Sequence, residues 1–90
     1  MALPHGDVAK LLHQAMQGAR AAGLAAAADE LEARTSLAFT SSSEFLGEVG
    51  LAIRQFLARE RGKVPVAVRQ QLRDCLAEVG RVWPGLGEVD

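Results

Sequence analysis

The sequence predicts an all-α protein, a compact bundle of four helices that form two αα-hairpins with antiparallel neighbours. Of the 90 residues 49% are hydrophobic but only 4% are aromatic, so the apolar share comes mainly from Ala, Leu and Val, and Ala favours helix. Four segments repeat apolar residues at helical spacing, and short connections join them. No run of four or more residues alternates as a strand does. The length predicts a single domain, residues 1–90, with a frayed tail from about residue 84.

The first part of the chain predicts two helices joined at a glycine. The first helix spans residues 4–22 and opens at Pro4, whose missing N–H is not needed in a first helical turn. Gly23 can take the left-handed conformation that ends a helix, and the second helix then ends near Arg34. The alternative is one continuous helix from Val8 to Arg34, because glycine costs a helix about 1 kcal/mol without forbidding it.

Residues 42–61 predict the longest helix, around which we expect the rest of the chain to be organised. Ser41 and Glu44 fit a capping box at its start, and Gly62 fits the position after its end. Its apolar residues fall in one broad arc, which we expect to be buried. They are Phe45, Leu46, Val49, Ala52, Ile53, Phe56 and Leu57.

The back of this helix lacks the charged surface of an ordinary peripheral helix. Two glycines inside a helix each cost about 1 kcal/mol relative to alanine, and the close approach of another backbone is a physical reason to tolerate them. We therefore expect either the second helix or a second copy of the chain to pack there. The residues of this predicted partner or dimer face are Gly47, Gly50, Leu51, Arg54 and Ala58.

The last helix is predicted to begin at Pro65 and to stop near Trp83, because Pro84 disfavours helical geometry in the residue before it. Its apolar stripe consists of Val68, Leu72, Cys75, Leu76, Val79, Val82 and Trp83. The connection before the third helix contains Leu37 and Phe39, which we expect to cover one end of the core.

The charges are unevenly distributed, although the formal net charge is −1. Residues 1–48 carry six acidic and three basic side chains, whereas residues 49–90 carry five acidic and seven basic ones. A basic patch lies around the turn between the third and fourth predicted helices. It fits an acidic partner or a phosphate, and a solvated helix end is the alternative interpretation. The net charge argues against nucleic acid as the partner. The patch consists of Arg59, Arg61, Lys63, Arg69 and Arg73.

One histidine suggests a different function. The segment from His13 to Gly18 resembles the phosphorylation site of histidine phosphotransfer domains, which are helical bundles with a solvent-facing histidine on a long helix. In that family a lysine and then a glycine follow the histidine at short helical spacing. Here no lysine lies between His13 and Gly18, and the glycine comes one residue late. The resemblance implies phosphate transfer through His13, and an ordinary surface histidine is the alternative interpretation.

The sequence predicts no catalytic residue, cofactor or metal site. Cys75 falls in the apolar stripe of the last helix, where we expect a buried, inert thiol. His5 and His13 are eight residues apart and lack an acidic residue at helical ligand spacing. The apolar run Ala21 to Ala28 is far shorter than the roughly 20 residues that span a bilayer. With a single cysteine, the chain is expected to be cytoplasmic.

By elimination, we expect a small non-enzymatic protein that works by binding another protein. An adaptor, an inhibitor or an immunity-type factor would fit, and so would a homodimer. The second face of the longest helix and the uneven charge support this expectation. The alternative is a phosphotransfer or phosphate-handling protein that uses His13.

Overall fold

The computed structural model describes residues 6–36 and 41–86, which form four α-helices and one short 3₁₀ helix. The helices are α1 (Gly6–Ala21), α2 (Ala25–Thr35), α3 (Ser42–Arg59), α4 (Val66–Val79) and the 3₁₀ helix η1 (Pro84–Leu86). Neither described range contains a strand, so the predicted all-α fold is confirmed. Leu37 and Phe39, which we expected to cover the core, lie outside the described residues.

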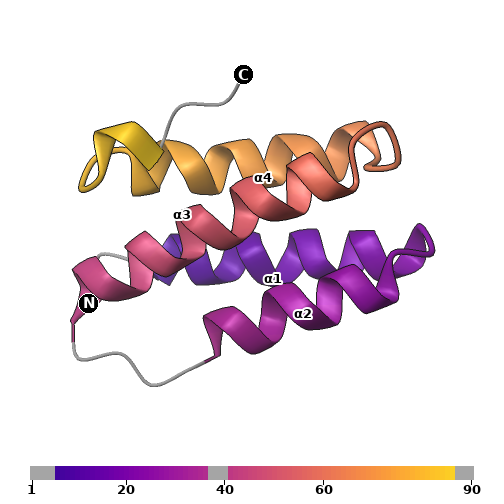
Figure 1. The fold of residues 1–90 in the computed structure, drawn as a ribbon, viewed down its shortest axis with the longest axis horizontal. Helices are drawn as coiled ribbons and strands as arrows, with labels where there is room; N and C mark the ends of the chain where they lie inside the picture. The colour runs from indigo at the N-terminus through magenta and orange to yellow at the C-terminus, as the bar shows by residue number, and fades with distance from the viewer. Residues whose placement is uncertain (1–5, 37–40, 87–90) are drawn as a thin grey trace.

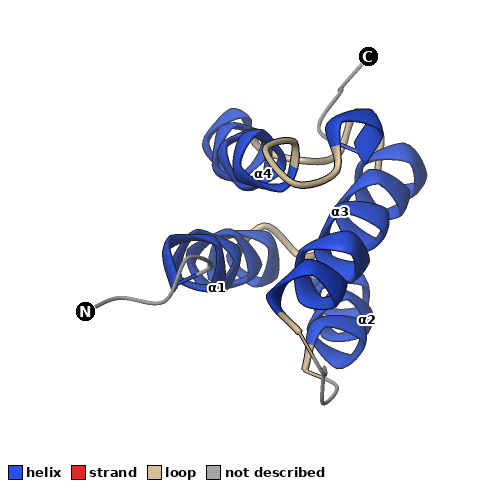
Figure 2. Cartoon of the chain, turned by 90° about the vertical axis from the view of Figure 1, so that its left-hand side faces the viewer, coloured by secondary structure: helices blue, strands red, loops and turns tan. Residues whose placement is uncertain are grey.

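Consecutive helices run in opposite directions, as expected for two αα-hairpins (Figure 1). Seen from one end, α4 and α1 lie on one side of the molecule and α3 and α2 on the other (Figure 2). Each helix has two neighbours: α1 and α3 both contact α2 and α4. The contact between α1 and α4 is the most extensive, so helices from opposite ends of the chain close the bundle.

The core takes side chains from all four helices and from Val64 in the turn before α4. Phe45 and Leu57, which we expected to be buried, are partly buried and pack against the edge of this core. Five of the buried residues are alanines, which lets the helices approach closely. The buried residues are Val8, Leu12, Ala15, Met16, Ala19, Ala27, Ala28, Leu31, Leu46, Val49, Ala52, Ile53, Phe56, Val64, Val68, Leu72, Cys75, Leu76 and Val79.

Gly18 marks a close approach of α1 to α4. Among the glycines whose surroundings are described, it has the nearest neighbouring atom. A Cβ atom at Gly18 would stand 2.7 Å from Cγ2 of Val68, closer than real Cβ contacts allow. Val68 is itself buried, and a β-branched side chain has few other rotamers to adopt. The glycine therefore sets the spacing of the two helices.

The joint between α1 and α2 is a Schellman motif centred on Gly23. Gly23 has a φ of 88°, in the left-handed region that favours glycine. The N–H of Leu24 donates to the carbonyl of Ala19 at 2.9 Å, and the N–H of Gly23 donates to that of Arg20 at 3.1 Å. Leu24 then packs against the core. The two-helix interpretation is confirmed, and the continuous helix is wrong.

The two ends of α3 and the start of α4 agree with the prediction from the sequence to within one turn. Ser41 caps α3, because its hydroxyl oxygen accepts the N–H of Glu44 at 3.2 Å. The helix ends at Arg59, two residues before the predicted end, and Gly62 follows with a φ of 82°. Pro65 is the N-cap of α4, one position outside the first helical residue that we expected.

The end of α4 differs from the prediction because Trp83 leaves the helix to contact α3. The helix stops at Val79, with Gly80 as its C-cap, instead of near Trp83. Nε1–H of Trp83 donates to the carbonyl oxygen of Ser43 at 2.7 Å. This tertiary contact outweighs the continuation of the apolar stripe. Pro84–Leu86 then form η1, which contacts α3, where we expected no regular structure; residues 87–90 lie outside the described residues.

Candidate partner surface

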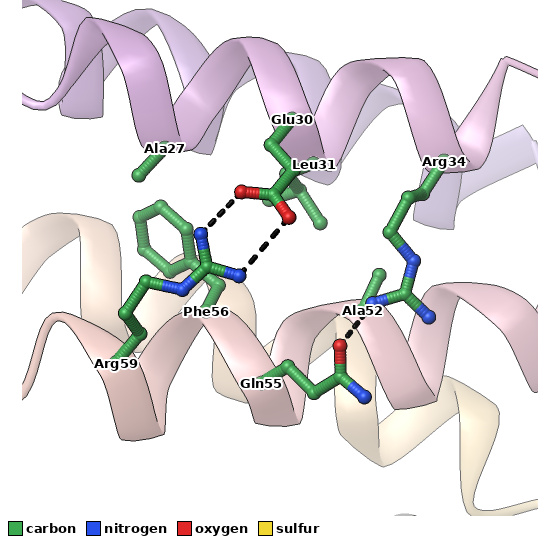
Figure 3. Close-up of a pocket in the computed structure, with 8 residues that line it drawn as sticks. All are labelled: Ala27, Glu30, Leu31, Arg34, Ala52, Gln55, Phe56 and Arg59. Atoms are coloured by element: carbon green, nitrogen blue, oxygen red, sulfur yellow. Dashed lines mark hydrogen bonds and ion pairs between the residues drawn. The ribbon is translucent and has the colours of Figure 1, made fainter.

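The seam between α2 and α3 is held by charged side chains that bridge the two helices (Figure 3). Both Nη atoms of Arg59 donate to the carboxylate of Glu30. Arg34 donates through Nε to Glu48 at 2.9 Å and through Nη1 to Gln55. The apolar side chains that line the same seam are Ala27, Leu31, Ala52 and Phe56.

This seam is too small to be a ligand site. The cavity in the seam has a volume of about 10 Å³, which is room for roughly one water molecule. Small-molecule sites usually offer about 300 to 1,000 Å³. The seam therefore attaches α2 to α3, and its charged groups are already satisfied by one another.

A second set of ion pairs attaches α2 to α1. Nη2 of Arg20 lies 2.8 Å from Oδ1 of Asp29 and also contacts the carboxylate of Glu32. The hydrogen bonds that Arg20 donates to these carboxylates raise its pKa. In the same way the hydrogen bond from Arg59 lowers the pKa of Glu30. Arginines from α1, α2 and α3 are thus occupied inside the molecule.

The basic patch predicted from the sequence divides into one paired and four unpaired cations. Arg59 belongs to the α2–α3 seam through Glu30. The other four form no ion pair within the described part of the chain, and we call them the basic surface. They are Arg61, Lys63, Arg69 and Arg73. Arg69 is half-buried and the other three are exposed.

The predicted partner face on α3 is partly covered by Trp83, in the turn after α4. The indole of Trp83 lies against Gly47, where a Cβ atom would stand 3.3 Å from Nε1. Gly50 is buried. We expected α2 or a second copy here, but α2 packs on a different stripe of α3, through Glu48 and Gln55. Trp83, in the turn after α4, therefore occupies the position beside Gly47 where we expected α2 or a second copy.

The rest of the predicted face divides by exposure. Leu51 and Ala58 are exposed, and Arg54 is partly buried. Leu51 follows Gly47 by one helical turn, so it continues along the stripe beside the contact of Trp83. Whether this face binds a partner stays a prediction.

The exposed large hydrophobic side chains of the described residues lie on α3, at the start of α4 and in the turn after α4, and we call this the α3–α4 side. Trp83 is 43% exposed although its ring contacts Gly47. Val66, in the first turn of α4, is 83% exposed. The full set is Leu51, Val66, Val82 and Trp83. Val82 and Trp83 were predicted to continue the apolar stripe of the last helix, and the early end of α4 explains why they are at the surface.

The residues behind the alternative function lie on α1. His13 is exposed on α1. Gly18, the glycine of the phosphotransfer resemblance, faces Val68 of α4 and is explained by packing. The structure therefore offers a packing role for Gly18 that needs no phosphoryl group.

Cys75 is a buried thiol, as predicted. Burial raises its pKa to about 12, and Asp74 acts in the same direction. Its Sγ lies 3.7 Å from the carbonyl oxygen of Val8, within the core. A nucleophilic cysteine requires the thiolate and some exposure, and Cys75 has neither at neutral pH.

The described residues include no group of three or more His, Cys, Asp or Glu side chains placed to hold a metal ion, and His5 lies outside them. None of the helices in that part of the chain combines the length and the hydrophobicity needed to cross a bilayer. Comparisons with protein-family models, with curated proteins and with solved structures gave no match.

Proposed function

We propose that this protein is a non-enzymatic binding domain that recognises another protein through its α3–α4 side. The observation that carries the proposal is the position of the exposed large hydrophobic side chains, Leu51, Val66, Val82 and Trp83. The described parts of α1 and α2 carry no such side chain. Aromatic side chains such as Trp83 are enriched in protein interfaces.

The interior of the molecule supports a role without catalysis. The Cys75 thiol is buried in the core, and the α2–α3 seam has room for roughly one water molecule. A cytoplasmic adaptor, inhibitor or immunity-type factor would act in this way. A homodimer through the same side is the second arrangement that the exposed hydrophobic residues favour.

Affinity capture with matched baits tests the proposal. The baits are the wild type, a Leu51→Ser variant, and a control variant Ala9→Ser on the exposed surface of α1. We expect one protein to be retained by the wild type and the control and lost with Leu51→Ser, because Leu51 is exposed and its replacement leaves the core intact. The same bound proteins on all three baits would refute the proposal.

Sedimentation equilibrium separates the two arrangements. For a protein that binds a different partner we expect the mass of a monomer over the micromolar range. A dimer that dissociates in the Leu51→Ser variant would show instead that the α3–α4 side binds a second copy.

A further inference from the structure

We infer that the basic surface, together with Val66, binds an acidic segment of a partner protein. This inference rests on the proposed function, because it names the chemistry of the partner that the α3–α4 side takes. It adds a location, the end of the bundle where the turn between α3 and α4 meets the first two turns of α4 (Figure 1).

The basic surface differs in charge pairing from the other arginines with described partners. Arg20, Arg34 and Arg59 are each held by a carboxylate from another helix. Nη1 of Arg81, just beyond the end of α4, lies 3.5 Å from Oε2 of Glu78. The four cations of the basic surface have no such partner among the described residues, although the chain carries more acidic than basic side chains.

Asp74 and Glu60, which adjoin the basic surface in the sequence, form no ion pair with it. Asp74 follows Arg73 directly, but its carboxylate accepts the side-chain N–H of Gln70 at 3.0 Å. Glu60 acts on Arg59, whose pKa it helps to raise. The first turn of α4 contains no acidic side chain. The donors of the basic surface are therefore not engaged in an ion pair with any described acidic side chain.

The outer side of α4 brings Val66 together with cations of the basic surface. Val66, Arg69 and Arg73 have the spacing i, i+3, i+7, so they lie on one side of the helix. Lys63 lies in the turn three residues before Val66. At 1.5 Å per residue the helical part of this site is about 10 Å long, roughly two turns of a partner helix. An exposed valine with cations along the same side fits a segment that offers both carboxylates and an apolar side chain.

A protein segment fits this site better than a nucleic acid. Binding to nucleic acid depends mainly on cations that neutralise phosphates, and the whole chain has a net charge of −1. Single-stranded nucleic acid also stacks on aromatic side chains, whereas the side chain at this site is the aliphatic Val66. Burial of Val66, which is 83% exposed, is gained with an apolar partner and not with a phosphate.

Nuclear magnetic resonance titration of the ¹⁵N-labelled protein tests the inference without a cellular partner. The probes are a short synthetic peptide of Glu and Leu designed as an amphipathic helix, its counterpart with Gln in place of Glu, a short DNA duplex, and inorganic phosphate. We expect the acidic peptide to shift the amide resonances of Lys63, Val66, Arg69 and Arg73, and we expect this binding to weaken as salt is raised.

Variants identify the side chains that carry the binding. The double replacement of Arg69→Gln and Arg73→Gln should weaken binding of the acidic peptide by about three- to tenfold, as expected for two exposed ion pairs. Val66→Ser should also weaken it, because the apolar contact is lost. Arg81→Gln is the matched control, since Arg81 is an exposed arginine beyond the end of α4, and it should leave binding unchanged.

Four outcomes would overturn the inference. They are unchanged binding in the double arginine variant, equal weakening in Arg81→Gln, equal binding of the Gln peptide, and tighter binding of DNA or of phosphate than of the acidic peptide. These outcomes differ from a failure of the proposed function. A partner captured by the wild type and lost with Leu51→Ser would keep the binding role even if its contact with the basic surface were refuted.

Discussion

Replacing Gly18 by alanine tests the close packing of α1 against α4. Alanine normally stabilises a helix by about 1 kcal/mol relative to glycine. Here the added methyl group would lie 2.7 Å from Cγ2 of Val68, and overpacking of this kind costs about 1 to 3 kcal/mol. The two effects predict a variant between about 0 and 2 kcal/mol less stable than the wild type. An exposed helical glycine would show the opposite sign.

A double-mutant cycle with Val68→Ala isolates the contact. Val68→Ala alone removes two buried methyl groups and should cost roughly 1 to 3 kcal/mol. In that background the clash is absent, so Gly18→Ala should stabilise by about 1 kcal/mol, which gives a coupling energy of about 1 to 3 kcal/mol. Urea unfolding followed by far-ultraviolet circular dichroism measures all four proteins. Stabilisation by Gly18→Ala in both backgrounds would refute the close approach of the two helices.

Three further predictions concern the core, the α2–α3 seam and the thiol of Cys75. Phe56→Ala should cost about 3 to 5 kcal/mol in urea unfolding and Phe45→Ala clearly less, because Phe56 is buried and Phe45 only partly so; equal losses would contradict this core. Arg59 lowers the pKa of Glu30, so the contribution of Glu30 to stability is present above its unfolded pKa and is lost as the pH falls through the lower folded pKa. Glu30→Gln should therefore destabilise the protein at pH 7 and no longer in acid, and a constant difference across this pH range would argue against the pair. Cys75, whose pKa is raised to about 12, should react with a thiol reagent at the rate of unfolding; rapid reaction of the native protein would show exposure.

The fold could be predicted because each helix carries its own local signals. Gly23 ends α1 and Ser41 begins α3, and both act through bonds to residues close in the sequence. The apolar stripes identified most of the buried residues for the same reason, since helical spacing decides which side chains share a face. The four helices and their order therefore needed no tertiary information.

The candidate surface was harder to predict because it depends on contacts between distant residues. Trp83 continued the apolar stripe of α4 in the sequence, but its hydrogen bond to Ser43 takes it out of the helix and onto Gly47. Arg59 was predicted to belong to the basic patch, but its guanidinium donates to Glu30, which lies 29 residues earlier. No local sequence pattern indicates which acidic residue pairs with which arginine of a neighbouring helix.

Site-specific photo-crosslinking in the cell tests the central claim most directly, that the α3–α4 side binds another protein. A photoreactive amino acid is placed at Leu51, at Val66 or, as a control on the exposed surface of α1, at Lys10. The account predicts a crosslink to one and the same protein from positions 51 and 66 and none from position 10. A partner captured from position 10 alone, or no crosslink from either position on the α3–α4 side, would contradict it.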